Sequence, residues 1–290
     1  MPRTVDEGFR DFLTKLTPTQ SETQTAKTHR ASIEASLKSN FEMVRFVRIG
    51  SFGNGTSISG FSDVDYLASI PAKHLTESSS YSLEKIKNTL DERFPDTGVE
   101  VKCPAIHIPF GTSISETTEV VPADFISRTN DIGLYEIADC DGGWKRASPD
   151  AHNNYVQKYD KKFGGKLKSL IRFIKAWKYY NQVPISSFYL ELRVAKFAEM
   201  ETTIVYEFDI KNIFKALYDG KLALMQDPMG ISEYISPCSS DAKFKEAYSK
   251  LTTAYVRSIK AGEASAKEDI KDAFGWWALV FNYEFPSYYY

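Results

Sequence analysis

The order of apolar and polar residues divides the chain into two parts with different predicted secondary structure. In the first part, short apolar runs with partial alternation predict strands, because successive side chains of a strand point to opposite faces. These runs are residues 43–49, 64–70, 99–110, 117–123 and 134–139. After Pro149 apolar residues recur every three or four positions, which predicts helices. We therefore predict a mixed sheet-and-helix lobe at residues 1–148 and a helical lobe at residues 149–290.

Helices are also predicted before and within the sheet region. Residues 5–40 predict one long amphipathic helix that joins the two lobes, with Ala26, Ile33 and Leu37 on a single face among polar residues. Residues 80–94 predict another helix, which ends before Pro95 because proline disfavours its continuation.

Two carboxylates at the start of the second predicted strand are the strongest chemical signal. Asp63 and Asp65 are two residues apart and so project from the same face, with Val64 and Tyr66 on the opposite face. Paired carboxylates repel each other unless a cation lies between them. Mg²⁺ takes oxygen ligands and shares them with substrate phosphates, and two such ions activate an attacking hydroxyl and stabilise the leaving oxygen. The pair predicts a site for two Mg²⁺ ions, with Mn²⁺ able to substitute.

A third carboxylate on a neighbouring strand would complete such a site. Glu119 is the best candidate, and Asp124 is the alternative. Pro122 lies between them and is expected to interrupt strand pairing before Asp124, because proline has no N–H to donate. Glu119 alone could equally be an exposed strand residue.

A glycine-rich turn precedes the carboxylate pair. Gly50 and Ser51 come just before the stretch GNGTSIS, which could start a short helix. The Ser51 hydroxyl and the following backbone N–H groups would form a cradle for an anion. An isolated Gly-Ser or Asp-x-Asp is also common at surfaces, but their order and spacing together favour a triphosphate site beside a metal site.

The second part contributes a basic helix and an aromatic one. The basic positions are Lys168, Arg172, Lys175 and Lys178. The first three are spaced by four and three residues, which predicts one face able to hold triphosphate oxygens; a solvated surface is the alternative. The next helix opens with Ser187, a candidate phosphate ligand, and Phe188, whose ring could stack on a base or belong to the core.

Composition limits the other possibilities. The net charge of −2 disfavours binding of long nucleic acids, which usually requires a basic surface. The cysteines are Cys103, Cys140 and Cys238; their odd number and lack of CxxC spacing predict neither a disulfide framework nor a zinc site. The chain shows no signal peptide and no apolar run of about 18 residues, so we expect no membrane association and a cytoplasmic location. The scattered histidines His29, His74, His107 and His152 are expected to be structural.

These motifs resemble a known family. Gly50-Ser51 with Asp63-x-Asp65 resembles the signature of the polymerase-beta nucleotidyltransferase superfamily. EVVPA at 119–123 is similar to the third-carboxylate strand of oligoadenylate synthetase and cyclic GMP-AMP synthase, and residues 167–193 are similar to the paired helices of that group. The nearest resemblance is to the bacterial CD-NTases, cyclic oligonucleotide synthases of antiphage signalling, and among them to the CdnE-like cyclic dinucleotide synthases.

The resemblance implies an α+β fold, with a polymerase-beta-type lobe followed by a C-terminal helical lobe, and a reaction. Asp63, Asp65 and Glu119 would be metal ligands, although many relatives have Asp in place of this Glu. The resemblance also implies that Ser51, Lys175 and Ser187 contact phosphate and that Phe188 stacks on a base. A 3′-hydroxyl would attack the alpha phosphate of a triphosphate, pyrophosphate would leave, and a second transfer would close the ring.

Base choice and partners are further expectations. A small polar residue near Ser169 sorts bases in the relatives, and serine there favours adenine, which implies a cyclic dipurine such as cyclic di-AMP. We expect ATP and other nucleoside triphosphates as partners, an effector reached through the product, and a monomer. The alternatives are a linear-oligonucleotide or other small-substrate nucleotidyltransferase, and an inactive nucleotide-binding module.

Overall fold

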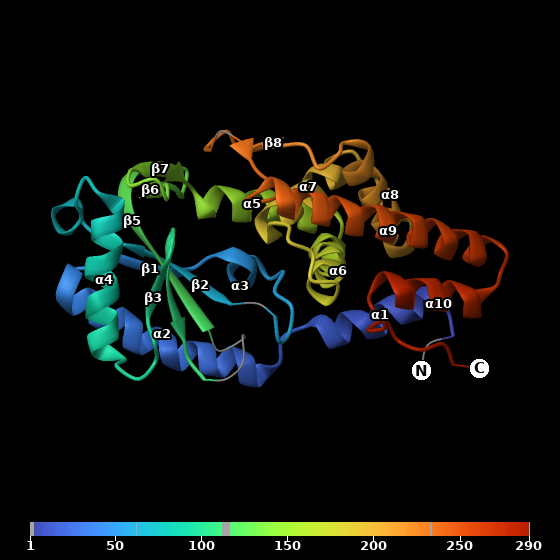
Figure 1. The fold of residues 1–290 in the computed structure, drawn as a ribbon, viewed down its shortest axis with the longest axis horizontal. Helices are drawn as coiled ribbons and strands as arrows, with labels where there is room; N and C mark the ends of the chain where they lie inside the picture. Colours follow the sequence, from blue (N-terminus) through green and yellow to red (C-terminus); the bar gives the residue numbers. More distant parts are fainter. Residues whose placement is uncertain (1–2, 62, 112–116, 233, 290) are drawn as a thin grey trace. The chain divides into compact units, whose positions relative to one another are not determined.

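The computed structural model describes residues 3–61, 63–111, 117–232 and 234–289, without the side chains of residues 20–28 (Figure 1). The elements of the first half are α1 (Val5–Leu16), α2 (Gln20–Phe41), β1 (Arg45–Arg48), α3 (Gly50–Asn54), β2 (Val64–Ser69), η1 (Ala72–His74), α4 (Ser79–Arg93), β3 (Glu100–Lys102), β4 (Ala105–Pro109), β5 (Thr117–Thr129), β6 (Ile132–Ala138) and β7 (Trp144–Ala147). Those of the second half are α5 (Pro149–Lys162), α6 (Lys166–Tyr180), α7 (Ser187–Glu199), α8 (Tyr206–Asp219), β8 (Met225–Gln226), β9 (Tyr234–Ile235), α9 (Asp241–Ala266) and α10 (Ile270–Val280). The predicted place of Ala26 on a helix face lies outside the described side chains.

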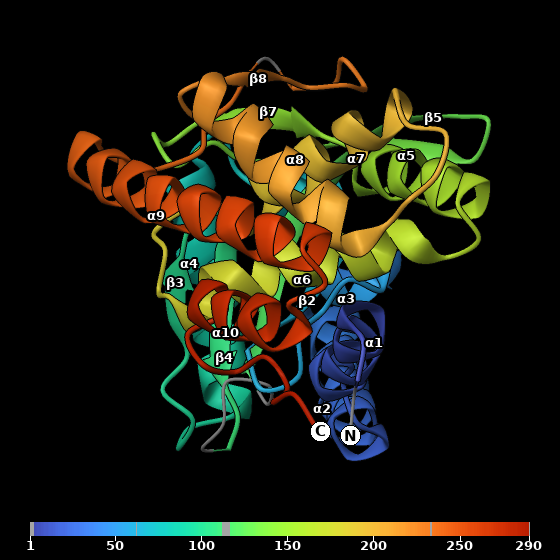
Figure 2. The same cartoon turned by 90° about the vertical axis from the view of Figure 1, so that its right-hand side faces the viewer.

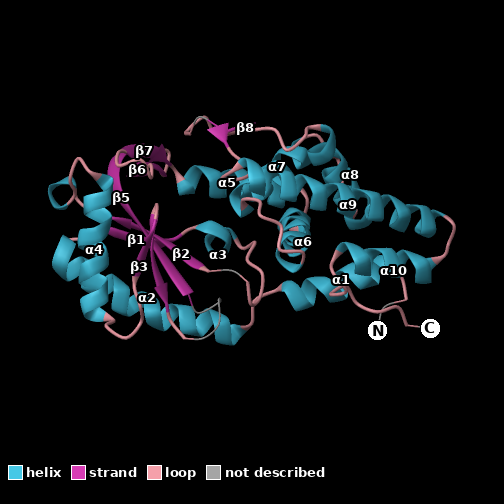
Figure 3. Cartoon of the chain, viewed as in Figure 1, coloured by secondary structure: helices cyan, strands magenta, loops and turns pink. Residues whose placement is uncertain are grey.

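The chain forms two compact units. The sheet unit is Pro18–Asn154, and the helical unit combines Met1–Thr17 with Tyr155–Tyr290. This division differs from the predicted one, because α1 belongs to the helical unit. The predicted single N-terminal helix is interrupted: Thr17 is extended (φ −81°, ψ 127°), as expected for a residue that precedes a proline. Figure 3 shows the strands β1–β7 gathered in the sheet unit.

The sheet unit contains a mixed sheet. Its described strands follow the order β1-β2-β5-β4-β3, and β6 and β7 extend it from β5. Strands β2 and β5 are parallel, and the other pairs are antiparallel. A mixed sheet with helices followed by a mainly helical region confirms the predicted α+β class.

One face of the sheet is covered by α2 and α4 (Figure 1). Val64, Tyr66 and Val120 point to this side and pack with Ile33 of α2 and Ile86 of α4. All five side chains are at most 1% exposed. Since side chains alternate along a strand, the intervening polar residues of β2 and β5 lie on the opposite face.

Strand β5 continues through Pro122, so the predicted interruption is wrong. Ala123 pairs with Ser69 of β2 on one side and with Ile137 of β6 on the other. Strand β6 therefore lies on the same edge of β5 as β4, but nearer the C-terminal end of β5. The described pairing with β4 ends at Val120. Pro122 therefore lies where β5 changes its neighbour from β4 to β6, a position where a missing N–H is tolerated.

The prediction that the cysteines form no disulfide is also wrong. Cys103 and Cys140 are bonded, with their Cα atoms 5.6 Å apart. Cys103 lies in the turn between β3 and β4, and Cys140 follows β6, so both are close to the place where β5 changes its neighbour from β4 to β6. The sheet register brings them together across 37 residues of sequence, a proximity that spacing alone does not reveal.

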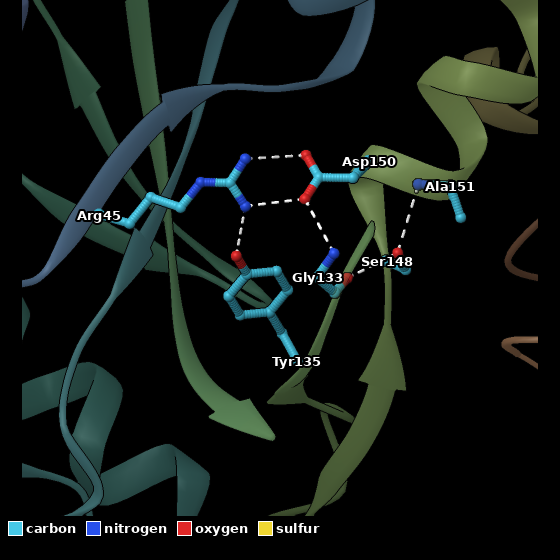
Figure 4. Close-up of polar contacts among 6 residues, drawn as sticks. All are labelled: Arg45, Gly133, Tyr135, Ser148, Asp150 and Ala151. Carbon is cyan, nitrogen blue, oxygen red and sulfur yellow. Dashed lines mark hydrogen bonds and ion pairs between the residues drawn. The ribbon is translucent and has the colours of Figure 1, made fainter. Parts of the chain in front are cut away.

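An ion pair fixes the start of α5 to the sheet (Figure 4). The Arg45 guanidinium of β1 donates to both carboxylate oxygens of Asp150, at 2.8 and 3.0 Å. Arg45 also donates to the Tyr135 hydroxyl, and the Gly133 N–H donates to Asp150 at 3.2 Å. Burial alone would raise the pKa of Asp150, but these hydrogen bonds outweigh it and hold the pKa below its ordinary value.

The helical unit has an aromatic core to which α1 contributes. The Phe9 ring lies 5.1 Å from the rings of both Phe173 of α6 and Trp277 of α10, and the Phe12 ring lies 4.8 Å from that of Phe281. Figure 2 shows α9 beside α8 and α10 in this unit. Among the described residues, none of the helices is long and apolar enough to cross a membrane.

Candidate active site

The acidic pair lies at the start of β2, on the face opposite the core. Asp65 is half-buried, whereas its neighbours Val64 and Tyr66 are enclosed on the other side. Asp63 directly precedes the strand and is also half-buried. The two carboxylates and the two apolar side chains therefore lie on opposite faces, as predicted.

Glu119 occupies the position beside Asp65. The two residues are register partners in the parallel pairing of β2 with β5, so their side chains share one face. Asp124 instead pairs with Glu136 of β6, beyond the last residue of β2 that pairs with β5. Asp124 comes five positions after Glu119 in the same strand, and this odd offset directs their side chains to opposite faces. Glu119 is thus the better placed candidate, for a different reason from the one predicted.

The three carboxylates share a face without being gathered around one point. Within the described ranges, no group of three or more His, Cys, Asp or Glu side chains stands ready to hold a metal ion. The donor set nevertheless suits Mg²⁺ or Mn²⁺, because it consists of carboxylate oxygens.

Gly50 allows the turn before α3 to lie directly against Asp65. Its φ is +58°, and a Cβ atom there would sit only 2.0 Å from the Asp65 carboxylate oxygen Oδ2. The Ile49 N–H also donates to the Asp65 carbonyl at 2.8 Å. The short helix covers Gly50–Asn54, slightly earlier than predicted, and half-buried Ser51 lies in it.

A histidine extends the row of polar residues across the sheet. His107 of β4 is the register partner of Glu119, and Glu100 of β3 is the partner of His107. The Glu100 carboxylate lies 3.2 Å from His107 Nδ1 and 2.8 Å from Lys102 Nζ. The hydrogen bond from Lys102 lowers the pKa of Glu100. Sequence reasoning treated His107 as one of several scattered histidines, because only the register places it next to Glu119.

In the helical unit, the end of α6 and the start of α7 form a polar and aromatic cluster. Lys178 Nζ donates to Ser187 Oγ at 2.5 Å, and the Tyr179 hydroxyl lies 3.2 Å from the same oxygen. Ser186 caps α7, and Phe188 is 44% exposed. Lys178 is the last of the basic positions predicted for this helix, one turn after Lys175.

Lys175 is enclosed and does not lie on an accessible face of α6. This side chain is 1% exposed, and its ammonium lies 3.4 Å from the Glu191 carboxylate of α7. Lys168 donates from Nζ to Gln157 at 2.6 Å, and burial lowers the pKa of Arg172. Lys175 therefore belongs to an internal ion pair, and its predicted contact with phosphate is not supported.

The predicted role of Ser169 in base choice is not supported either. Ser169 is 7% exposed, and it forms a hydrogen bond with the Tyr206 hydroxyl of α8. Burial raises the pKa of Tyr206, and the hydrogen bond with Ser169 acts against this shift. The side chain lies inside the helical unit rather than at an accessible helix edge.

Comparison with known proteins agrees with the fold, which is that of a nucleotidyltransferase. A family model described as Second Messenger Oligonucleotide or Dinucleotide Synthetase domain (SMODS) matches residues 3–159. The chain belongs to this family, whose bacterial members include the CD-NTases.

Individual relatives are similar over most of the chain. A probable cyclic nucleotide synthase of Bacillus cereus (strain VD146) is 26% identical over 239 residues, which cover 78% of this chain and 69% of the relative. The structure of CdnC of E. coli MS115-1 with ATP aligns with a TM-score of 0.75 at 16% identity, over 97% and 98% of the two chains. The CdnE cyclic dinucleotide synthase of Elizabethkingia meningoseptica, solved with GTP and Apcpp, aligns with a TM-score of 0.64 at 17% identity, over 85% and 96%. The predicted CdnE-like subgroup stays a prediction.

Proposed function

We propose that this chain is a cyclic dinucleotide synthase that joins nucleoside triphosphates by two-metal nucleotidyl transfer. The observation that carries the proposal is the parallel register that sets Glu119 beside Asp65 on the face of the sheet opposite α2 and α4. The close approach of Gly50 to Asp65 supports it, because this contact brings the backbone of a Gly-Ser turn to the carboxylate pair.

The carboxylates Asp63, Asp65 and Glu119 are the residues that would hold two Mg²⁺ ions, or Mn²⁺ in their place. When bound, the ions activate the attacking 3′-hydroxyl and stabilise the leaving oxygen. Ser51 and the backbone N–H groups near it hold phosphate oxygens through hydrogen bonds.

The other predicted nucleotide contacts in this proposal belong to the helical unit. Lys178 and Ser187 contact triphosphate oxygens. This role suits them because the lysine ammonium and the serine hydroxyl already lie within hydrogen-bonding distance of each other. Lys168 and Arg172 add positive charge. The exposed Phe188 ring stacks on a base, and stacking tolerates any base because each has a π face.

We further propose that the product is a cyclic dipurine such as cyclic di-AMP, which serves as a cytoplasmic second messenger in antiphage signalling. Relatives of the same fold were solved with ATP or with GTP, which supports purine nucleotides as substrates. A messenger acts through an effector that binds the product. With Ser169 buried, other residues choose the base.

The reaction is tested by incubating the protein with all four labelled ribonucleoside triphosphates and Mg²⁺, followed by phosphatase treatment and mass spectrometry. A phosphatase-resistant product with two nucleotides, made mainly from ATP, is expected. A linear product would favour a chain-forming transferase instead. Nucleotide binding without pyrophosphate release would favour an inactive nucleotide-binding module.

Glu119→Gln and Asp124→Asn form a matched pair for the same assay. We expect Glu119→Gln to lower the rate of synthesis at least about 100-fold, because charge stabilisation dominates phosphoryl transfer. Asp124→Asn should retain most activity, since Asp124 lies past the end of β2. Loss of activity only in the Asp124 variant would refute the assignment of the third carboxylate.

A further inference from the structure

A cavity of about 300 Å³ lies in the helical unit between α7, α8 and the turn that follows α8. Its lining comes from residues between 189 and 200, on α7 and just after it, and from residues between 213 and 223. The volume is at the lower end of the range typical of small-molecule sites. None of the residues assigned to nucleotide chemistry is among them.

The base of the cavity is apolar and its rim is open. Tyr189, Ile213 and Leu217 are at most 5% exposed and form firm, apolar surface. Met200 is 87% exposed at one end, a high value for a large apolar side chain. Ala216 and Gly220 of the α8 side carry little or no side chain, which leaves room between the two helices.

A fixed positive charge lies within this apolar surface. The Arg193 guanidinium is 5.1 Å from the centre of the Tyr189 ring and donates to the carbonyls of Ala223 and Leu224, at 2.5 and 3.2 Å. Its Nε is enclosed and has no acceptor among the described residues. Carbonyl groups orient the guanidinium without neutralising it.

Lys196, on the rim, forms an ion pair with a carboxylate that also has other partners. Glu199 lies 2.6 Å from Lys196 Nζ and accepts hydrogen bonds from the hydroxyls of Tyr155 and Tyr159. The Lys196 side chain is 56% exposed, so its ammonium can turn towards the cavity mouth at little cost. The cavity therefore combines apolar walls with positive charge.

This cavity lies on the far side of α7 from the nucleotide-contacting cluster. At about 100° per residue, the lining residues Tyr189, Arg193 and Lys196 point to roughly the opposite side of the helix from Ser187. Ser187 contacts α6 through Lys178. One helix thus presents two chemically different surfaces, and the cavity is not part of the site described above.

We propose that the cavity between α7 and α8 is a binding site for a small organic anion with a flat apolar body, of the aromatic carboxylate class. The ring of such a ligand lies on the apolar floor between Phe197 and Leu217. Its carboxylate faces Arg193 and Lys196. Charge-assisted hydrogen bonds to an arginine held in place cost little ordering, which favours an acidic over a neutral ligand.

The test is calorimetric titration of the full chain with the probe 2-naphthoate and with its uncharged counterpart 2-naphthalenemethanol. We expect a Kd on the order of 100 µM for 2-naphthoate, which is in reach of a ligand of about a dozen non-hydrogen atoms. The alcohol should bind at least about tenfold more weakly, because it cannot use the positive charge. Equal affinity of the two, or no binding of 2-naphthoate at about 1 mM, would overturn the proposal.

Three variants locate the binding. Arg193→Met should weaken 2-naphthoate about tenfold, and Ala216→Phe should abolish binding by filling the space between the helices. Arg10→Met, at an exposed arginine of the same unit, should leave it unchanged. If Arg193→Met lowers the thermal midpoint strongly, Ala216→Phe decides, because Ala216 is exposed and its replacement leaves the Arg193 hydrogen bonds intact. Unchanged affinity in Ala216→Phe would rule out this cavity.

Discussion

At the scale of single residues, Gly50 does two things that another residue cannot combine. Its positive φ turns the chain after β1, and its missing side chain leaves space for the Asp65 carboxylate. A glycine before a serine is a weak signal in sequence. The structure explains why a glycine is needed there: a Cβ atom at this position of the turn would collide with the carboxylate of Asp65, a candidate metal ligand.

We expect Gly50→Ala to lower the rate of nucleotide transfer at least about 100-fold, because Asp65 or the turn must move by about an ångström. Gly98→Ala is the matched control: it has φ +77° but open space around it, so it adds backbone strain without displacing a carboxylate. Both proteins should remain folded by circular dichroism. Equal losses of activity in the two variants would attribute the effect to backbone strain alone.

The two lysines near the end of α6 should differ in their effect. Lys178→Met should raise KM for the triphosphate about tenfold with little change in stability, because this lysine is half-buried and contacts Ser187. Lys175→Met should instead lower the free energy of unfolding by about 3 kcal/mol, because it leaves Glu191 enclosed without its ion-pair partner. Steady-state kinetics and urea unfolding of both variants check this. The opposite pattern would restore Lys175 as the phosphate contact.

At the scale of elements, the contact between Arg45 and Asp150 ties the first turn of α5 to β1 (Figure 4). Asp150→Asn should lower the free energy of unfolding by about 2 kcal/mol, less than for a fully buried pair because both side chains keep some exposure. Asp91→Asn, which breaks an ion pair within one turn of α4, should cost at most about 0.5 kcal/mol.

The cost of Asp150→Asn should depend on pH. The folded-state pKa of Asp150 is below its ordinary value of 3.8, so the wild-type carboxylate adds stability above that pH. This contribution falls as the pH drops below 3.8 towards the lowered pKa, because the unfolded chain takes up the proton first. Urea midpoints of wild type and variant should therefore converge on acidification. A constant difference from pH 7 to pH 3 would contradict the role of the charge.

Most strands and helices were predictable from apolar periodicity, whereas the pairing between them was not. The runs at 43–49 and 64–70 contain β1 and β2, because each has enough alternation to define its faces. Pro122 misled the prediction of where β5 ends, since its cost depends on which strand lies beside it. The link between Cys103 and Cys140 and the place of His107 depend on register in the same way, and register is a property of the whole sheet.

At the scale of the whole molecule, α1 is separated in sequence from the unit to which it belongs. A helix at these residues was predicted from the sequence, but the identity of its partners was not, because Trp277 and Phe281 are far away in sequence. The predicted division at residue 148 followed the change of periodicity. Periodicity marks where strands stop and does not show which core a distant helix joins.

Phe12→Ala should destabilise the helical unit by about 3–5 kcal/mol, because the ring is fully buried among aromatic partners. Hydrogen exchange measured by mass spectrometry should accelerate in peptides of α6 and α10 and stay unchanged in those of β2 and β5. Val256→Ala, at a 46% exposed position of α9, is the control and should change neither. Equal acceleration in both units would show that they unfold together.

The arrangement of the units makes the sheet unit an insertion within the helical one, and this affects the order of folding during synthesis. Residues 18–154 are contiguous and can fold as soon as they leave the ribosome. Phe12 leaves earlier but finds Phe281 only after nearly the whole chain has been made. At about 5–20 residues per second, the apolar face of α1 waits for some tens of seconds. The helical unit is therefore completed last, and the newly made chain carries an exposed aromatic surface until then.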